Sequence, residues 1–581
     1  MRGGRRILTT LTVVVLTLFG VTVDPSHAVA APRLHQTCEI RCSPAEHVHF
    51  DYWPATASDK GPRVVPVSNR PQLTFYVNAV AGKDTNPGTS PLHPWRTLRR
   101  VNREHLEGGD QVLLASGESF TGTLRLNSTN LVSTSVTQRL TIGSYGSGPA
   151  VIVAGHHSGI LAVNVSGVHI TDLKITGTAT SCRFGNDGIF FGARHAVGML
   201  SAGVIVDHVE TSGFCDGIAI GSHDDQSQIA DVEISNVMSH DNADAGVLTF
   251  DPALKNHDIH DVTVSNTQAY RNANQGGIVL FGVNTGVVEH SVAWGNGARA
   301  SGSVGIWAFD ATGITIEFNE SYGNLTTRDD GDGFDLDGGV SNSVVQYNYS
   351  HDNAGIGLLI CGCVGFYSMA NNIVRYNVSQ NDGSSGQPSG LYLLGGEPLS
   401  GVDIFNNTVV SGAGTGPLAV VDPGGSTLAH VHVRNNLFVT TAPKVLLQVT
   451  NPTMTSDLAL QGNDWWSEMA PWSVQWDTQT YVSLSSWSAA TGAEQLSGTP
   501  IGLSANPLVC SLGGGSIEWP NPPAALDAYD LQAGSPLIDS GLNLLQQFGI
   551  DPGQVDFAGS PVVYGAGYDI GVSERQPGES C

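Results

Sequence analysis

The sequence predicts an all-β fold in which short parallel strands coil into a solenoid. Two recurring phrases are typical of such a coil. One places an asparagine every 29 residues, at Asn319, Asn348, Asn377, Asn406 and Asn435. The other places a glycine before alternating apolar and variable residues, at positions 159, 188, 217, 246, 277, 305, 333, 355 and 390. This alternation indicates strands, and no helical period separates them. A β-propeller is the alternative, but its blades are longer, at roughly 40 to 50 residues.

The N-terminus has the features of a secretory signal peptide. Arg2, Arg5 and Arg6 precede an apolar run, and small residues with Ala-x-Ala spacing follow at Ala28 and Ala30. A single-pass anchor is the alternative, but no other segment is apolar over a length that spans a bilayer. We therefore expect a secreted, extracellular protein without a membrane partner.

These features divide the chain into four parts. Residues 1–30 are the expected signal peptide, and residues 31–72 form a cysteine-containing extension without an interpretable pattern. The repeats place the β-helix at residues 73–445. Residues 446–581, which include NDWWSEMAPWSVQW, are expected to form an irregular cap over the open edge of the last turn.

Export makes the eight cysteines candidates for disulfides. Cys182 and Cys215 each precede a Gly-Ile pair in equivalent strands, so we predict a disulfide between neighbouring turns. Cys510 and Cys581 are placed to hold the C-terminus. The pairs Cys38/Cys42 and Cys361/Cys363 are close in sequence, and their connectivity stays open.

The composition restricts the partners of the chain. Only 13% of the residues are charged, the formal net charge is −26, and lysine occurs only at positions 60, 83, 174, 255 and 444. Nucleic acid is excluded as a partner because its binding depends on Lys and Arg at phosphates. The same deficit argues less strongly against a highly anionic polysaccharide, because a bound metal could offset the charge. We expect an extracellular polysaccharide as the partner and a monomeric protein.

Both ends of the repeat region resemble a known superfamily. FYVNAVAGKDTNPGTSPLHPWRTLRRVN and GGDQVLLASGESFTG are similar to the opening segment of secreted right-handed parallel β-helix proteins of the pectin-lyase-like superfamily. DLQAGSPLIDSG and YDIGVSE resemble its closing segment. The resemblance, from about Phe75 to Glu574, implies a right-handed parallel β-helix and a carbohydrate-active protein. It does not fix the reaction, because the superfamily includes lyases, hydrolases, epimerases and phage tailspikes.

Side chains at the second and fourth positions after each repeat glycine point out of the predicted coil. Many of them are aromatic, namely Phe250, Phe281, Trp307, Phe309 and Tyr392. Aromatic rings stack on the C–H faces of sugars, so we expect these residues to bind substrate in a groove. The alternative is that a loop covers this face and makes it a second small core. His351, in an SHDN turn, is a further substrate-binding candidate, with a structural hydrogen bond as its alternative role.

The stretch RDDGDGFDLDGG contains the candidate catalytic residues. Asp335 and Asp337 are the paired carboxylates of the outward stripe, and residues two apart on a strand lie roughly 6.5 to 7 Å apart at Cα. An inverting glycoside hydrolase separates its two acids by about 6.5 to 9.5 Å. The sequence therefore predicts Asp335 and Asp337 as a catalytic pair.

Aligning the repeats assigns each acid a role. Asp337 is predicted to lie between Phe309 and Leu359, where desolvation raises its pKa and suits a general acid. Asp335 is predicted to lie between Trp307 and Gly357, where the missing side chain leaves room for water and suits the ionised base.

The remaining acids of this region are candidate metal ligands. No cofactor is required by the hydrolase hypothesis, but Asp310, Asp330 and Asp332 could hold Ca²⁺, since hard cations take several oxygen ligands. The alternative is capping of Asx turns, the common role of Asp before Gly. The segment does not fit the EF-hand loop, because Phe334 stands where a ligand is required.

Three functions remain in order of preference. The first is a glycoside hydrolase that cleaves an extracellular glycan. The second is a pectate-lyase-like polysaccharide lyase or epimerase, with Ca²⁺ on the acidic cluster and Arg271, Arg299 or Arg328 as base. The third is a non-catalytic glycan-binding protein with the same groove.

Overall fold

The computed structural model describes residues 70–581 except 133, 183–185, 195–198, 223–226, 252–256, 301, 364–367, 386–387, 389, 456, 470, 516–525 and 579–580. The predicted signal peptide and nearly all of the N-terminal extension lie outside the described residues. Among the described residues, no helix combines the length and apolar character needed to cross a membrane.

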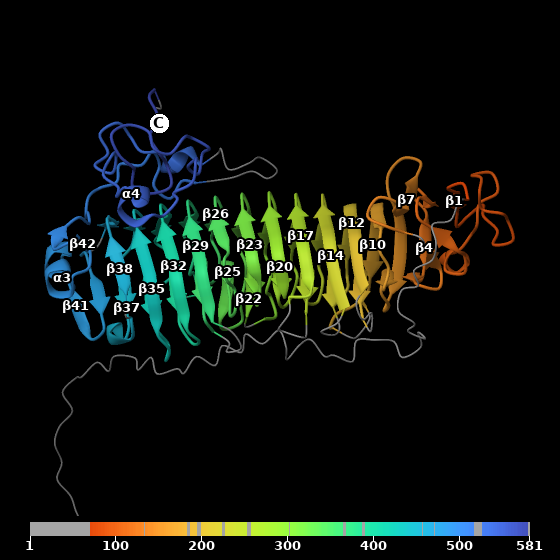
Figure 1. Ribbon diagram of the computed structural model, residues 1–581, viewed down its shortest axis with the longest axis horizontal. Helices are drawn as coiled ribbons and strands as arrows, with labels where there is room; N and C mark the ends of the chain where they lie inside the picture. The colour runs from red at the N-terminus through yellow and green to blue at the C-terminus, as the bar shows by residue number, and fades with distance from the viewer. Residues whose placement is uncertain are drawn as a thin grey trace, which may run out of the picture. The chain divides into compact units, whose positions relative to one another are not determined.

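The fold is a parallel β-helix, as predicted, and its strands lie side by side in a long row (Figure 1). One face is a 14-stranded sheet that is parallel except for its last pair. Its strands are β5 (Leu124–Asn127), β9 (Ile160–Val163), β11 (Ile189–Ala193), β13 (Ile218–Ser222), β16 (Ala245–Phe250), β19 (Gly276–Phe281), β22 (Ser303–Phe309), β25 (Asp330–Leu336), β28 (Leu358–Cys361), β31 (Leu391–Leu394), β34 (Ala419–Asp422), β37 (Leu447–Val449), β40 (Val474–Trp476) and β41 (Gln479–Tyr481).

The other strands of each turn belong to a 25-stranded sheet in two parallel runs. The first run contains β1 (Thr74–Val77), β3 (Gln111–Ala115), β7 (Leu140–Tyr145), β10 (Val168–Gly177), β12 (Met199–Ser212), β14 (Ser227–Ser235), β17 (Ile259–Ser265), β20 (Val283–Glu289), β23 (Thr312–Glu317), β26 (Val344–Gln346), β29 (Met369–Arg375), β32 (Leu399–Phe405), β35 (Leu428–Arg434) and β38 (Leu458–Gln461). The second run contains β4 (Ser119–Thr121), β8 (Ala150–Gly155), β15 (Met238–His240), β18 (Gln268–Tyr270), β21 (Val292–Trp294), β24 (Glu320–Tyr322), β27 (Tyr349–His351), β30 (Val378–Gln380), β33 (Thr408–Ser411), β36 (Leu437–Thr440) and β39 (Asp464–Ser467).

Short elements complete the described chain. They are α2 (Leu98–Val101), α3 (Leu484–Thr491), α4 (Leu544–Phe548), the 3-10 helices η1 (Pro452–Met454) and η3 (Asp527–Tyr529), and the strands β2 (Leu106–Glu107), β6 (Leu131–Val132), β42 (Gln495–Leu496) and β43 (Thr499–Pro500). The first and third residues after most repeat glycines face a continuous apolar core, as Ile306, Ala308, Phe334 and Leu336 show. The prediction is wrong at Gly355, where Ile356 packs in another cluster and Leu358 and Ile360 are the core residues.

A ladder of buried asparagines runs along one corner of the coil. The side-chain Oδ1 of each asparagine accepts hydrogen bonds from the backbone N and Nδ2 of the asparagine one turn earlier, at 2.9–3.1 Å. Asn319, Asn348 and Asn377 stack as predicted. The ladder then continues through Asn407, Asn436 and Asn463, so the predicted members Asn406 and Asn435 are wrong by one residue. The turn before Asn407 contains one extra residue, which shifts the register.

A second buried ladder runs along another corner and was not predicted. Its members are Asn242, Asn272, Asn296, Asn324 and Asn353, and the last of them donates to Asp382 at 2.8 Å. The first ladder likewise ends on an acid, because Asn463 donates to Glu494 at 2.8 Å. These bonds satisfy the polar groups of the tight turns inside a dry interior.

The region after residue 445 differs from the predicted cap. Parallel pairing continues beyond residue 445, through β38, β39 and β40. The hairpin β40–β41 and Trp487 of α3 pack at the end of the core. Later residues lie against the outer side of the last turns: Leu542 and Leu544 pack on Tyr347, Tyr376 and Phe405. This segment therefore covers a side wall as well as the end of the coil.

The structure contains the predicted disulfide between Cys182 and Cys215, whose Cα atoms are 4.6 Å apart. It also pairs Cys510 with Cys581, and Cys361 with Cys363. The bond between Cys182 and Cys215 joins neighbouring turns, and the bond between Cys510 and Cys581 links residues that are 71 positions apart in the sequence.

Candidate active site

Strand β25 places its acids on the outward face of the 14-stranded sheet. Phe334 and Leu336 face the apolar core, so the alternate residue Asp335 faces outward, and Asp337 continues this alternation. In register, Asp335 lies between Trp307 of β22 and Leu359 of β28. The predicted neighbour Gly357 is wrong, because Gly333 aligns with Gly357 and not with Gly355: Phe334 N donates to Gly357 O.

The predicted open groove is wrong, because most of its side chains are buried. Trp307, Phe309 and Phe281 are only 2–5% exposed and pack with Leu248 and Val279. Phe250 and Tyr392 are half-buried and pack at the edges of two apolar clusters on this side. Alternation along a strand reveals which side chains point outward, but not what covers them. The second small core considered as the alternative is the arrangement found.

The acids of this face are buried with the aromatic residues. Asp330, Asp332, Asp335 and Asp337 are 0–7% exposed. Burial and then the charge of Asp337 raise the pKa of Asp335 well above its usual value. Burial and then Asp337 raise the pKa of Asp330 to about 8. Burial and then Asp330 also raise the pKa of Asp332. Backbone N–H groups donate to two of these acids: Gly338 N to Asp337 Oδ1 at 2.7 Å and Ile356 N to Asp332 Oδ1 at 2.5 Å.

Several buried polar atoms on β22 and β25 have no hydrogen-bond partner. They are Ser303 Oγ, Trp307 Nε1, Asp332 Oδ2 and Asp335 Oδ1. Trp307 and Asp335 are direct neighbours across the two strands. Buried polar atoms nearly always have partners, so a group of exceptions indicates a place where a polar ligand binds. Together with the buried carboxyl groups of Asp330, Asp332, Asp335 and Asp337, these atoms define the candidate active site on β22 and β25.

The predicted metal ligands are only partly brought together. The charge of Asp330 contributes to the raised pKa of Asp332, whose Oδ1 accepts a hydrogen bond from Ile356 N. Asp310 instead lies beside His257, with Oδ1 and Nε2 3.7 Å apart. A Ca²⁺ ion shared by Asp310, Asp330 and Asp332 remains a prediction.

His351 belongs to a different face from the β25 acids. It ends a row of stacked rings on the second run of the larger sheet, formed by His240, Tyr270, Trp294, Tyr322 and His351. Its ring is paired with Glu320 at 3.0 Å and Asp352 at 2.9 Å. Because the rings stack on one another, their faces are occupied and are not platforms for a sugar. The structural role considered for His351 is the one that its contacts support.

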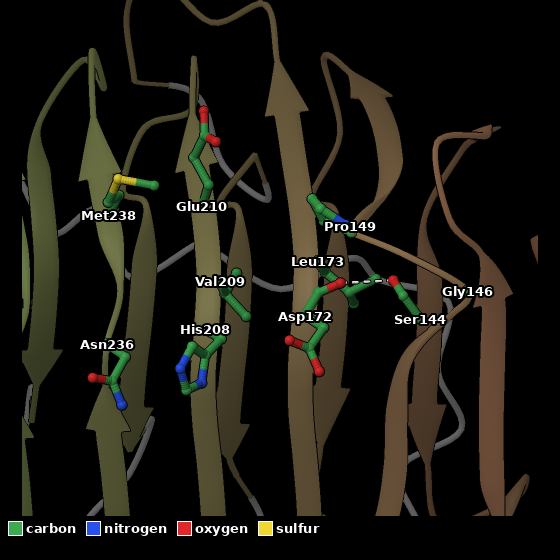
Figure 2. Close-up of a pocket in the computed structure, with 11 residues that line it drawn as sticks. Ser144, Gly146, Pro149, Asp172, Leu173, His208, Val209, Glu210, Asn236 and Met238 are labelled. Carbon is green, nitrogen blue, oxygen red and sulfur yellow. Dashed lines mark hydrogen bonds between the residues drawn. The ribbon is translucent and has the colours of Figure 1, made fainter.

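A cavity of about 380 Å³ lies beside β7, β10, β12 and β15 and was not predicted. Figure 2 shows Asp172, His208 and Asn236 in one row across neighbouring strands, with Glu210 and Met238 in another. Glu210 is held by Lys174 at 2.5 Å and by His240 at 3.3 Å. Burial alone raises the pKa of Glu210, but these hydrogen bonds lower it overall, so Glu210 stays ionised. A general acid is therefore better placed on β25.

No protein-family model matches the chain. The chain is 24% identical over 592 residues to a lacto-N-biosidase of Bifidobacterium longum subsp. longum, covering 81% of this chain and 34% of that protein. It thus spans about a third of the length of this relative. Among solved structures, it is similar to a GH136 lacto-N-biosidase from Eubacterium ramulus (TM-score 0.46, 16% identity, 70% of this chain and 68% of that one). It is also similar to a pectate lyase (TM-score 0.34, 15% identity, 87% and 97% of the chains).

Proposed function

We propose that this chain is an exported glycoside hydrolase that cleaves an extracellular glycan with carboxyl groups of β25. The observation that carries the proposal is the group of buried acids there, whose charges raise the pKa of their neighbours, because hydrolysis of a glycosidic bond needs one protonated and one ionised carboxyl. The similarity to a lacto-N-biosidase supports this reaction class. Glycans that contain lacto-N-biose are accordingly the first substrates to test.

For the pair Asp335 and Asp337, we propose roles opposite to those predicted from the sequence. Asp335 is covered by Leu359, and its raised pKa keeps it protonated, as a general acid requires. Asp337 accepts the bond from Gly338 N and suits the ionised base or nucleophile. The roles are reversed because Gly357, which was predicted to leave room for water beside Asp335, aligns with Gly333 instead.

Asp330 is a second candidate for the acid. Burial and then the charge of Asp337 raise the pKa of Asp330 to about 8, which lies close to a neutral working pH. An acid with its pKa near the working pH is the more effective proton donor. Asp337 is common to both possible pairs, so its replacement is the stricter test of the site.

The experiment incubates the secreted protein with a panel that includes lacto-N-biose glycans and uronate polysaccharides. New reducing ends without unsaturated-uronate absorbance support the hydrolase. Absorbance of unsaturated uronate indicates the lyase alternative, and binding without cleavage indicates a glycan-binding protein.

Variants then assign the site. We expect Asp337→Asn to lower kcat by at least about a hundredfold, in the range of lost acid–base catalysis. The comparison of Asp335→Asn with Asp330→Asn identifies the acid, because its loss spares substrates with good leaving groups. Asp329→Asn is the matched control, since Asp329 is half-exposed and paired with Arg328 at 2.6 Å. If Asp337→Asn cleaves the glycan at the wild-type rate, the reaction takes place outside the β25 site.

A further inference from the structure

The disulfide between Cys361 and Cys363 lies beside one of the candidate catalytic acids. A carboxylate oxygen of Asp337 and the two sulfur atoms all lie within 4.8 Å of one another. The strand register accounts for this contact: Asp335 of β25 pairs with Leu359 of β28, and the same alignment two residues later places Asp337 beside Cys361. Side chains two apart on a strand point to the same face, so Cys361 shares the outward face of the sheet with Asp337.

These sulfur atoms form part of an apolar wall next to the acid. Cys361 is fully buried in a cluster with Leu359 and Leu394, and the partly buried Cys363 packs against this cluster. A disulfide has no hydrogen to donate, and its sulfur atoms are weak acceptors. The wall therefore keeps water from one side of the carboxyl group of Asp337, a residue that is only 1% exposed.

The backbone between the two cysteines is held by the next turn of the coil. Gly362 N donates to Leu394 O at 2.7 Å, and Glu397 N donates to Gly362 O at 2.6 Å. A Cβ atom at Gly362 would lie 2.8 Å from Glu397 O, so glycine permits this close approach of two backbones. The next turn thus fixes the backbone of this segment, and the disulfide fixes its side chains.

Loss of the disulfide bond would change the surroundings of Asp337 and leave the coil intact. Two sulfur atoms that are no longer bonded must move apart to their van der Waals distance. Cys361 has little room to move, because β28 pairs with β25 on one side and with β31 on the other. The partly exposed Cys363 must therefore turn away, which lets water enter beside the carboxyl group of Asp337.

We propose that the Cys361–Cys363 disulfide is a positioning element of the candidate active site, which keeps the carboxyl group of Asp337 dry and fixed in orientation. This inference rests on the proposed role of Asp337 in glycan hydrolysis. A reacting group must be held in the correct geometry, and a small misplacement costs up to about a hundredfold in rate. The disulfide should affect kcat more than KM, because it acts on the reacting group and not on glycan binding.

The test removes the sulfur pair by Cys361→Ala/Cys363→Ala, which leaves the other disulfides intact. We expect kcat to fall at least about tenfold while KM changes less than about threefold and the circular dichroism of the coil persists. Cys363→Ala, which opens the same bond at the partly exposed cysteine, serves if the double variant is not secreted. Cys182→Ala/Cys215→Ala is the matched control and should keep the kcat of the wild type, because β13 lies four strands from β25 in the smaller sheet.

Labelling of carboxyl groups with a water-soluble carbodiimide, located by peptide mass spectrometry, measures the burial of Asp337 without reference to activity. Asp337 should be protected in the wild type and labelled in Cys361→Ala/Cys363→Ala, whereas the buried Asp382 should stay protected in both. If the wild type cleaves no glycan but this labelling difference is found, the hydrolase proposal is wrong and the disulfide still shields Asp337.

Three results would overturn the positioning role of the disulfide. The first is a variant that cleaves glycan at the wild-type rate. The second is a variant in which Asp337 stays protected from the carbodiimide, whatever its activity. The third is a secreted wild-type protein in which peptide mapping without reduction finds Cys361 and Cys363 as thiols, free or bound to a metal ion.

Discussion

At the scale of single residues, His351 makes stability depend on pH. Burial alone lowers its pKa, but hydrogen bonds to Asp352 and Glu320 raise it to about 9. Because the folded pKa exceeds the unfolded value, protonated His351 stabilises the fold fully below about pH 6.5, and this contribution disappears as the pH rises through 9. At about 1.4 kcal/mol per pKa unit, the contribution is about 3 kcal/mol.

The corresponding measurement compares thermal midpoints of the wild type and His351→Gln between about pH 6 and pH 9.5. The difference should be largest at the acidic end and shrink towards the alkaline end. His430→Gln is the control, since His430 is mostly exposed in its pair with Asp457. An equal difference at every pH contradicts the ion-pair origin.

Asp335 should reduce stability in the wild-type protein. It is buried between Trp307 and Leu359, and its Oδ1 has no partner. Replacing it by leucine removes this unsatisfied acceptor, so we expect stability to rise by about 1 to 3 kcal/mol while activity is lost. Calorimetric unfolding measures the change. Asp337→Leu removes an acceptor that Gly338 uses, and it should destabilise instead.

At the scale of elements, the asparagine ladder should dominate the stability of the middle turns. Asn348→Ala removes the Oδ1 that accepts from Asn319 and the Nδ2 that donates to Asn377, and all of these groups are buried. Each buried group left unsatisfied costs about 1 to 3 kcal/mol. We expect a marked drop in thermal midpoint, whereas the control Asn284→Ala, on a half-exposed outer position of β20, should change little.

The one-residue shift of the ladder predicts opposite effects at adjacent asparagines. Asn407 bonds Asn377 and Asn436, whereas Asn406 donates to Asp569 O and Gly571 O of the C-terminal segment. Asn406 has φ of 53°, so Asn406→Gly keeps its left-handed backbone. Limited proteolysis should release the C-terminal segment in Asn406→Gly. Asn407→Ala should instead lower the stability of the coil.

The sequence contained the coil itself, because a period-two pattern at a fixed spacing identifies stacked parallel strands. Registers were predictable only while that spacing held. Where a turn is shorter, near Gly355, or longer, before Asn407, the pattern fits two alignments, and hydrogen bonding selects the one that was not predicted. The burial of Trp307 and Asp335 was not predictable, because the residues that cover their side chains are distant in the sequence.

At the scale of the whole molecule, the C-terminal segment should be the first part to detach. Its end is held by the disulfide from Cys510 to Cys581, which closes a loop of 71 residues. On the chain-entropy model, such a crosslink contributes about 4 kcal/mol. We expect Cys510→Ser/Cys581→Ser to become sensitive to protease near the C-terminus while the circular dichroism of the coil persists. If the C-terminal segment and the circular dichroism of the coil are lost together, the segment does not detach separately from the coil.

Each of the two asparagine ladders ends at an acidic residue. Each asparagine side chain donates a hydrogen bond to the residue one turn later. The carboxylates of Asp382 and Glu494 accept such a bond but have no N–H of their own to donate, so no further asparagine is needed after them. Turns before these acids are interchangeable: duplication or deletion of one whole turn would leave an asparagine facing an asparagine. Turns beyond these acids are not interchangeable in this way. The ladders would therefore accept an additional whole turn between Asn272 and Asn353, whereas loss of a turn that contains β22 or β25 would remove the candidate active site.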